Sequence, residues 1–95
     1  MEKLTKFDIL DHPKTEEDFT LALPVAYEDD PGDGSLIAAT LGNIAKARGM
    51  TQLAKETGLS RESLYRSLSG KGRPEFATIL KVTKALGFSM APTPI

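Results

Sequence analysis

The stretch AKETGLSRESLYRSLSGKG, residues 54–72, constrains the fold more than any other part of the chain. Two segments with helical patterns stand on either side of the tripeptide GLS. Gly58 suits the left-handed conformation in which many helices end, and Ser60 suits the N-cap of a following helix. Ala54 is small enough for a close helix crossing, and Leu64 is placed to anchor the second helix on the first. The stretch predicts two short helices joined by a tight turn, or alternatively two ordinary packed helices of a small bundle.

The remaining segments also carry helical patterns, so we expect an all-α fold. The spacing of apolar residues predicts helices over residues 15–28, 36–48, 51–57, 61–69 and 74–86. Ser35 is the predicted N-cap of the second of these helices. Short extended segments are expected at both ends of the chain. At the C-terminal end, residues 88–95 hold two prolines, which disfavour a helix. These residues either stay single or pair with residues 7–9 as a two-stranded ribbon.

The first predicted helix is amphipathic. Thr15 is its expected N-cap, followed by three acids that suit the first turn of a helix. Phe19, Leu23 and Tyr27 form an apolar stripe along it. Pro24 is expected to kink or break the helix, because an interior proline removes a backbone hydrogen bond.

The charge of the chain is strongly divided. Residues 1–34 hold three Lys against ten acids, a net charge of −7, whereas residues 35–95 hold nine Lys and Arg against three Glu, a net charge of +6. Such asymmetry favours two partners, one cationic and one anionic. The alternative is that the two halves neutralise each other within one fold. We expect an acidic arm with one helix over residues 1–34, a core domain over residues 35–90 and a tail over residues 91–95.

The length of 95 residues allows one core. The chain has no Cys, which excludes disulfides and thiolate sites and fits a cytoplasmic protein. Its longest apolar run, residues 21–27, is far shorter than the roughly 20 residues of a membrane-spanning helix, and the first residues have no apolar signal region. We therefore expect no membrane contact.

The segment from Gly49 to Met90 resembles the helix-turn-helix core of the Cro and lambda-repressor (XRE-type) class. Together with FDILDHPKTEEDF and LGNIAKARGM upstream, residues 7–90 resemble the short HigA-like antitoxins called probable addiction module antidote proteins. The resemblance implies a lambda-repressor-like bundle of about five helices. It also implies an antitoxin of a type II toxin–antitoxin module that represses its own operon by binding double-stranded operator DNA. Its implied protein partner is a toxin, commonly a small basic ribonuclease.

The DNA-contacting residues that this resemblance and the side-chain chemistry indicate lie on and around the second helix of the motif. Arginine can bind both acceptors of a guanine, and lysine suits a phosphate. Glu62 is expected to accept from a cytosine or to pair with Arg66, and Tyr65 to contact DNA or to pack. The expected base-contacting residues are Arg61, Glu62, Tyr65 and Arg66, and the expected phosphate-contacting residues are Thr51, Gln52, Ser60, Ser69, Lys71 and Arg73. Because one recognition helix buries little surface, we expect a homodimer.

Phe19, Leu23 and Tyr27 are the expected toxin-binding residues, with the acids around them attracting a basic partner. The alternative is that this stripe packs on the core of the protein itself. Two other functions stay open at this point. One is a stand-alone phage-type or chromosomal repressor without a toxin, and the other is a protein-interaction module that no longer binds DNA.

No pattern indicates catalysis, a cofactor or a metal site, so we expect a protein that is not an enzyme. The loop DDPGDG fails as a calcium loop, because Pro31 stands at its third position and Thr40 at its twelfth. His12 is the only histidine and has no second ligand nearby in the sequence. The acids at residues 16–18 point in different directions on a helix and form no acid–base pair.

Overall fold

The computed structural model describes residues 16–71, 73–89, 92 and 94–95. Within these residues the fold is all-helical, as expected, with five helices and no strand. The helices are α2 (Glu16–Asp29), α3 (Ser35–Arg48), α4 (Met50–Thr57), α5 (Arg61–Ser67) and α6 (Phe76–Ala85). The predicted cap Thr15 and the ribbon segment at residues 7–9 lie outside the described residues.

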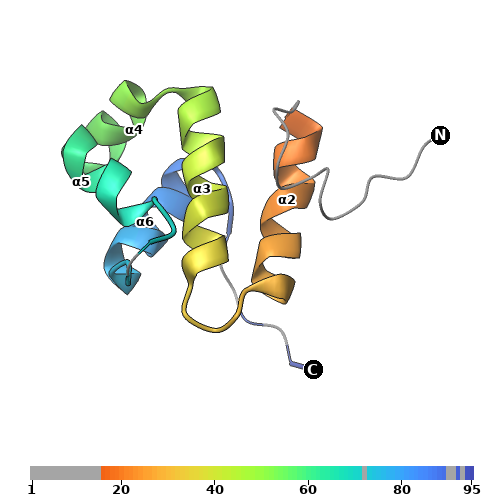
Figure 1. The fold of residues 1–95 in the computed structure, drawn as a ribbon. Coiled ribbons are helices and arrows are strands. Elements are labelled where there is room, and N and C mark those ends of the chain that lie inside the picture. The colour runs from red at the N-terminus through yellow and green to blue at the C-terminus, as the bar shows by residue number, and fades with distance from the viewer. Residues whose placement is uncertain (1–15, 72, 90–91, 93) are drawn as a thin grey trace.

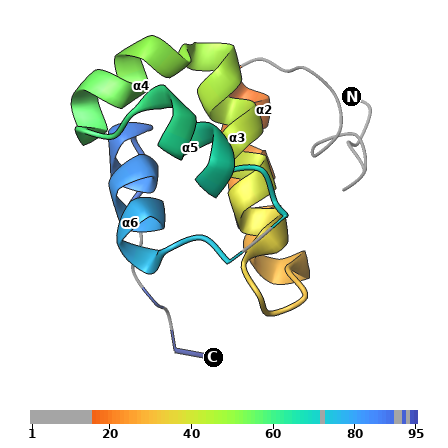
Figure 2. The ribbon, with the colours of Figure 1, turned by 60° about the vertical axis from the view of Figure 1, so that its left-hand side comes forward.

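Helix α3 stands at the centre of the molecule (Figure 1). Helix α2 packs along one side of it, and α4, α5 and α6 lie on the other side, where α4 contacts both α5 and α6. Figure 2 shows α5 in front of α3, with α6 beside the pair. The largest fully buried side chains come from three of these helices: Leu41, Ile44, Leu64, Val82 and Thr83. With Phe19 of α2 and Leu53 of α4, the apolar ones among them belong to one core cluster, to which all five helices contribute.

Helix α2 runs through Pro24 without interruption, so the predicted break is absent. Its inward face buries Phe19 and Leu23 in the core. An interior proline costs about 3 kcal/mol, whereas burial of one Phe or Leu side chain contributes about 1.5–3 kcal/mol. Two such side chains outweigh the cost of one proline, and the Pro24 ring itself lies on the exposed side of the helix.

The turn between α2 and α3 is held by the carboxylate of Asp30. Its Oδ2 accepts hydrogen bonds from the backbone N–H groups of Gly32 and Gly34, at 2.8 and 2.9 Å. Its Oδ1 accepts from the N–H groups of Leu36 and Ile37, at 2.9 and 3.2 Å. The first N–H groups of a helix have no partner within the helix, so this carboxylate satisfies two of them for α3.

The prediction that Ser35 caps α3 is therefore wrong. Gly34 occupies the cap position, with a φ of 81°, and offers no side-chain hydrogen bond. Asp30 supplies the missing acceptor from several residues upstream, and Asp33 Oδ1 accepts from the N–H of Ser35 at 2.9 Å. Negative charge at this position is also favourable for the helix dipole.

The other end of α3 is tied to its neighbours by Arg48. Its guanidinium carbon lies 5.8 Å from the ring centroid of Phe19 and 5.8 Å from that of Phe88, within the range of cation–π interactions. Its Nη1 donates to the carbonyl oxygen of Leu86. Arg48 thus connects α2 and α3 to the end of α6.

We expect Asp30→Asn to lower the midpoint of thermal unfolding at pH 7 by more than Asp33→Asn does. Asparagine keeps one acceptor oxygen, so two of the four N–H groups lose their partner, whereas Asp33 accepts one backbone hydrogen bond from Ser35. Circular dichroism melts of the three proteins measure the difference.

The same comparison depends on pH. Desolvation raises the pKa of Asp30, but its four backbone N–H donors outweigh this, and the net pKa is lowered. A lowered pKa means that the stabilisation is complete above the unfolded-state pKa of about 3.9 and disappears as the pH falls through the folded-state pKa. The gap between wild type and Asp30→Asn should therefore close below about pH 4. A gap of equal size at pH 7 and pH 2.5 would contradict the role of the ionised carboxylate.

Candidate nucleic-acid interface

Helices α4 and α5 form a tightly turned pair whose ends follow the sequence prediction. Gly58 ends α4 with a left-handed φ of 73°, and its N–H donates to the carbonyl oxygen of Ala54. Ser60 caps α5, because its Oγ accepts from the N–H of Ser63 at 3.0 Å. Between them the Oγ1 of Thr57 accepts from the N–H of Leu59 at 3.3 Å. Three residues therefore suffice to connect the two helices.

The second helix of the pair is anchored by leucines. Leu64 and Leu68 are buried as predicted, with exposed fractions of 0% and 5%. Helix α5 ends at Ser67, earlier than predicted, because Ser69 starts a turn. The Ser69 hydroxyl donates to the carbonyl oxygen of Arg66 and accepts from the N–H of Lys71.

The position of α5 also depends on two glycines. A Cβ on Gly42 of α3 would lie 2.6 Å from the carbonyl oxygen of Leu68, a distance at which one of the two helices must shift. Gly70 has a φ of +79°, and a Cβ there would lie 3.0 Å from the Cβ of Ala39. The end of α5 and the turn after it thus lie directly against α3.

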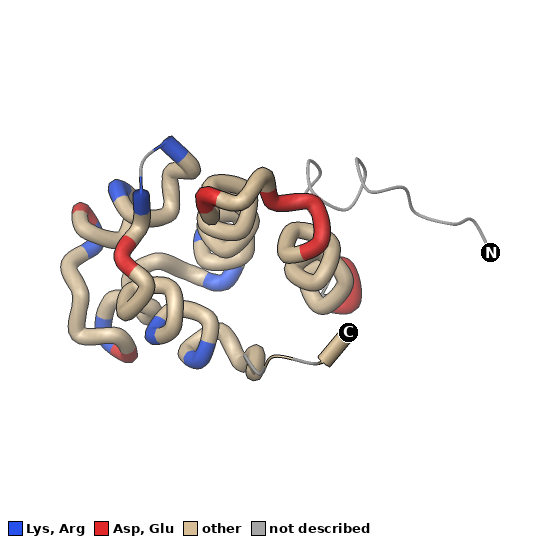
Figure 3. The backbone as a smooth tube through the Cα atoms, turned by 90° about the horizontal axis from the view of Figure 1, so that it is seen from below, with Lys and Arg blue, Asp and Glu red and all other residues tan. Residues whose placement is uncertain are grey.

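All ten predicted DNA-contacting residues are exposed on α4, on α5 and in the segments that flank α5. Arg61, Glu62, Tyr65 and Arg66 share one outward side of α5, as their spacing requires. Tyr65 has an exposed fraction of 43%, so it is not a core packing residue. Figure 3 shows Lys and Arg mainly on the side of the molecule away from α2. The structure thus leaves all ten predicted residues accessible to a ligand.

Several predicted phosphate contacts already have partners within the protein. Gln52 Nε2 donates to Glu56 Oε1 at 3.1 Å. The hydroxyl hydrogen of Ser69 is used by the carbonyl oxygen of Arg66. Ser60 differs, because its Oγ accepts a hydrogen bond and its hydroxyl hydrogen can still be donated. Of these three residues, Ser60 is therefore best prepared to contact an anion.

The two roles expected for Glu62, contact with a cytosine and pairing with Arg66, both stay predictions, and both side chains are exposed on α5. An exposed carboxylate and an exposed guanidinium on one helix face can both form hydrogen bonds with a ligand.

The predicted toxin-binding stripe does not form an exposed surface. Phe19 and Leu23 have exposed fractions of 8% and 4% and belong to the core. The structure thus has the alternative arrangement, in which α2 packs on the protein's own helices. A small core gains from this extra burial. Of the three residues, Tyr27 offers the most surface, with an exposed fraction of 40%.

One surface was missed by the sequence interpretation. Phe76 and Leu80 of α6 have exposed fractions of 67% and 40%, and with Tyr27 they line a groove of about 1150 Å³ between α6 and α2. Burial raises the pKa of the Tyr27 phenol, and the nearby Thr83 hydroxyl offsets part of this rise. The Thr83 Oγ1 is buried and forms no hydrogen bond of normal geometry. The sequence signal for this surface is that α6 has more apolar residues than its core-facing side needs, because Ile79, Val82 and Leu86 already fill that side.

Two kinds of site were searched for among the described residues. No group of three or more His, Asp and Glu side chains there is able to hold a metal ion. None of the helices in the same part of the chain has the length and hydropathy needed to cross a membrane.

Residues 3–94 match the model of a protein family described as probable addiction module antidote protein. A protein of Haemophilus influenzae strain Rd, named only as uncharacterized, is 47% identical over 85 residues, which cover 90% of this chain and 86% of the relative. No solved structure matches. The family match spans α2 as well as the α4–α5 pair, so both belong to the shared pattern.

We expect Gly42→Ala to lower the free energy of unfolding, against the usual helix preference. Alanine is favoured over glycine inside a helix by about 1 kcal/mol, but a forced fit in a packed interior costs about 1–3 kcal/mol. The exposed Ala47 of the same helix provides the control, since Ala47→Gly should show the helix preference alone, about 0.5–1 kcal/mol. Urea unfolding curves measure both changes. A more stable Gly42→Ala protein would contradict the close contact with Leu68.

Proposed function

This chain belongs to the family of probable addiction module antidote proteins, and on that premise we propose that it is the antitoxin of a type II toxin–antitoxin module. In this proposal it binds operator DNA in the cytoplasm, represses its own operon and neutralises a partner toxin by direct binding. The toxin is of the small basic ribonuclease class. The antitoxin acts by binding and has no catalytic activity of its own.

The observation that carries the DNA-binding part is the outward surface of α5. A helix that follows a three-residue turn, is anchored by Leu64 and presents two arginines can enter a major groove in the manner of a lambda-repressor-like helix-turn-helix. The first helix of the pair, α4, then lies across the DNA backbone.

Each side chain has a role that follows from its chemistry. Arg61 and Arg66 can each donate two hydrogen bonds to O6 and N7 of a guanine. Glu62 can accept from N4 of a cytosine. Ser60 donates to a phosphate, and Lys71 neutralises another as a mobile point charge. Thr51 and Arg73 extend the phosphate contacts on either side of α5.

The functional unit in this proposal is a homodimer. One recognition helix buries too little surface for strong specific binding. A two-fold dimer presents two helices to half-sites about 34 Å apart and doubles the contacts. The operator is therefore expected to be palindromic.

We expect Arg61→Ala and Arg66→Ala each to weaken binding to operator DNA by about 1–3 kcal/mol and to relax the preference at one base pair. Lys71→Ala should instead weaken binding to all sequences alike and reduce the salt slope by about one unit. Fluorescence anisotropy with operator variants at several salt concentrations separates these effects. Equal losses on every sequence for all three variants would leave only nonspecific electrostatic binding.

Co-expression with the product of the neighbouring reading frame tests the antitoxin role. We expect that product to arrest growth alone, and the two proteins to restore growth and to co-purify when made together. A repressor without a toxin partner would bind operator DNA but show neither result. A protein-interaction module would bind its partner but lack salt-dependent operator binding.

A further inference from the structure

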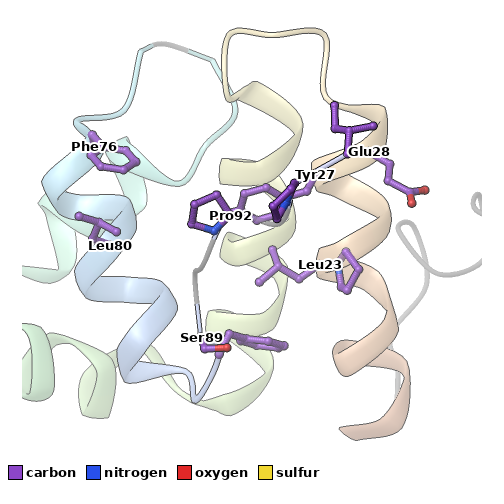
Figure 4. A pocket seen from close by; sticks show the side chains of 11 residues that line it. Leu23, Tyr27, Glu28, Phe76, Leu80, Ser89 and Pro92 are labelled. Atoms are coloured by element: carbon purple, nitrogen blue, oxygen red, sulfur yellow. The ribbon is translucent and has the colours of Figure 1, made fainter.

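The groove between α2 and α6 is an apolar surface that the DNA-binding role does not use. Figure 4 shows Leu23 and Tyr27 reaching from α2 towards α6, with Phe76 and Leu80 on the opposite wall and Pro92 between them. The cavity measures about 1150 Å³.

Three apolar side chains of this groove are exposed to solvent. Phe76, Leu80 and Tyr27 retain exposed fractions of 67%, 40% and 40%. Single exposed apolar residues are common on protein surfaces, whereas exposed apolar residues gathered around a groove can receive a partner. Aromatic residues at the centre of such a surface often carry much of the binding energy.

The charges around the groove indicate the chemistry of its occupant. Glu28 is the one charged residue among the described side chains that line it. Residues 16–45 contain seven Asp and Glu and no Lys or Arg. Figure 3 shows this acidic side at α2 and the turn that follows it. A complementary partner therefore presents apolar side chains for the groove with Lys or Arg beside them.

The groove is separate from the outward surface of α5. Helices α2 and α5 lie on opposite sides of α3, so the central helix stands between the acidic wall of the groove and the basic surface (Figure 1). The protein can thus hold one partner at the groove while α5 faces another.

We propose that the groove between α2 and α6 is the docking site for the toxin, and that it receives an apolar segment of the toxin flanked by Lys or Arg. The proposal rests on the antitoxin function, because it assigns a surface to the neutralising contact. It replaces the stripe of Phe19, Leu23 and Tyr27 with a surface to which α6 contributes as much as α2. Phe19 stays in the core, and Leu23 forms part of the groove wall.

The chain offers a matched pair of variants for the test. Tyr27 and Tyr65 are both exposed tyrosines, at 40% and 43%, on α2 and α5. Binding of the full-length chain to the purified product of the neighbouring reading frame is measured for wild type, Tyr27→Ala, Phe76→Ala and Tyr65→Ala. We expect the two groove variants to weaken toxin binding at least about tenfold and Tyr65→Ala to leave it unchanged. Operator binding should be unchanged in the two groove variants.

The charge of the groove is tested separately with Glu28→Lys. This change should slow association with the toxin and weaken its dependence on salt, because steering by charge acts mainly on the association rate. Glu56→Lys, an equal charge change on the exposed side of α4, should leave toxin association unchanged.

Circular dichroism melts establish that each variant is folded, so that a lost contact is not confused with unfolding. Unchanged toxin affinity in folded Tyr27→Ala and Phe76→Ala proteins would overturn the proposal. So would a change of self-association in these variants with unaltered toxin binding, since the groove would then be a contact between two copies of the chain. If the wild-type chain does not bind the product at all, the proposed antitoxin function is wrong as well. If the wild-type chain binds it and the groove variants bind equally well, only the proposed docking site is wrong.

Discussion

The arrangement of this molecule depends on the four hydrogen bonds that the Asp30 carboxylate accepts at the start of α3. They fix the turn after α2, and α2 can then lie along α3 and bury Phe19 and Leu23. A domain of this size has little apolar surface to bury, so the contribution of α2 is a substantial part of its core. The same placement leaves Leu23 and Tyr27 of α2 on one wall of the groove whose other wall is α6. One carboxylate thus underlies both the stability of the fold and the shape of its acidic side.

Much of the α4–α5 pair could be predicted from the sequence, because the signals that define it are local. Gly58 ends one helix and Ser60 begins the next through contacts within a few residues. Leu64 and Leu68 are four positions apart, so they share a face of any helix that contains them. Once Leu64 and Leu68 are assigned to the buried face, helix geometry alone determines which residues of α5 face outward. The exposure of all ten candidate residues could therefore be expected, while their binding to DNA stays a proposal.

The rest could not be predicted, because it depends on contacts between distant parts of the chain. The DDPGDG turn gave no sign that Asp30 would reach the N–H of Ile37, seven residues away. The stripe of Phe19 and Leu23 has the same spacing whether it faces a partner or the core, and only the position of α3 decides. Phe76 and Leu80 likewise belong to an apolar pattern whose exposed part is visible only after the core is filled. Nothing local marks Gly42 as the point where the end of α5 approaches α3.

The separation of charge seen in Figure 3 makes the molecule an electric dipole although its net charge is only −1. A uniform field exerts little net force on a molecule of such small net charge, but it exerts a torque on the dipole. The field of a polyanion therefore turns the molecule so that α5 faces the polymer and α2 faces the solvent. Orientation during the encounter, more than overall attraction, then decides which side arrives first. Salt shortens the range over which this alignment acts to about 10 Å at 0.1 M.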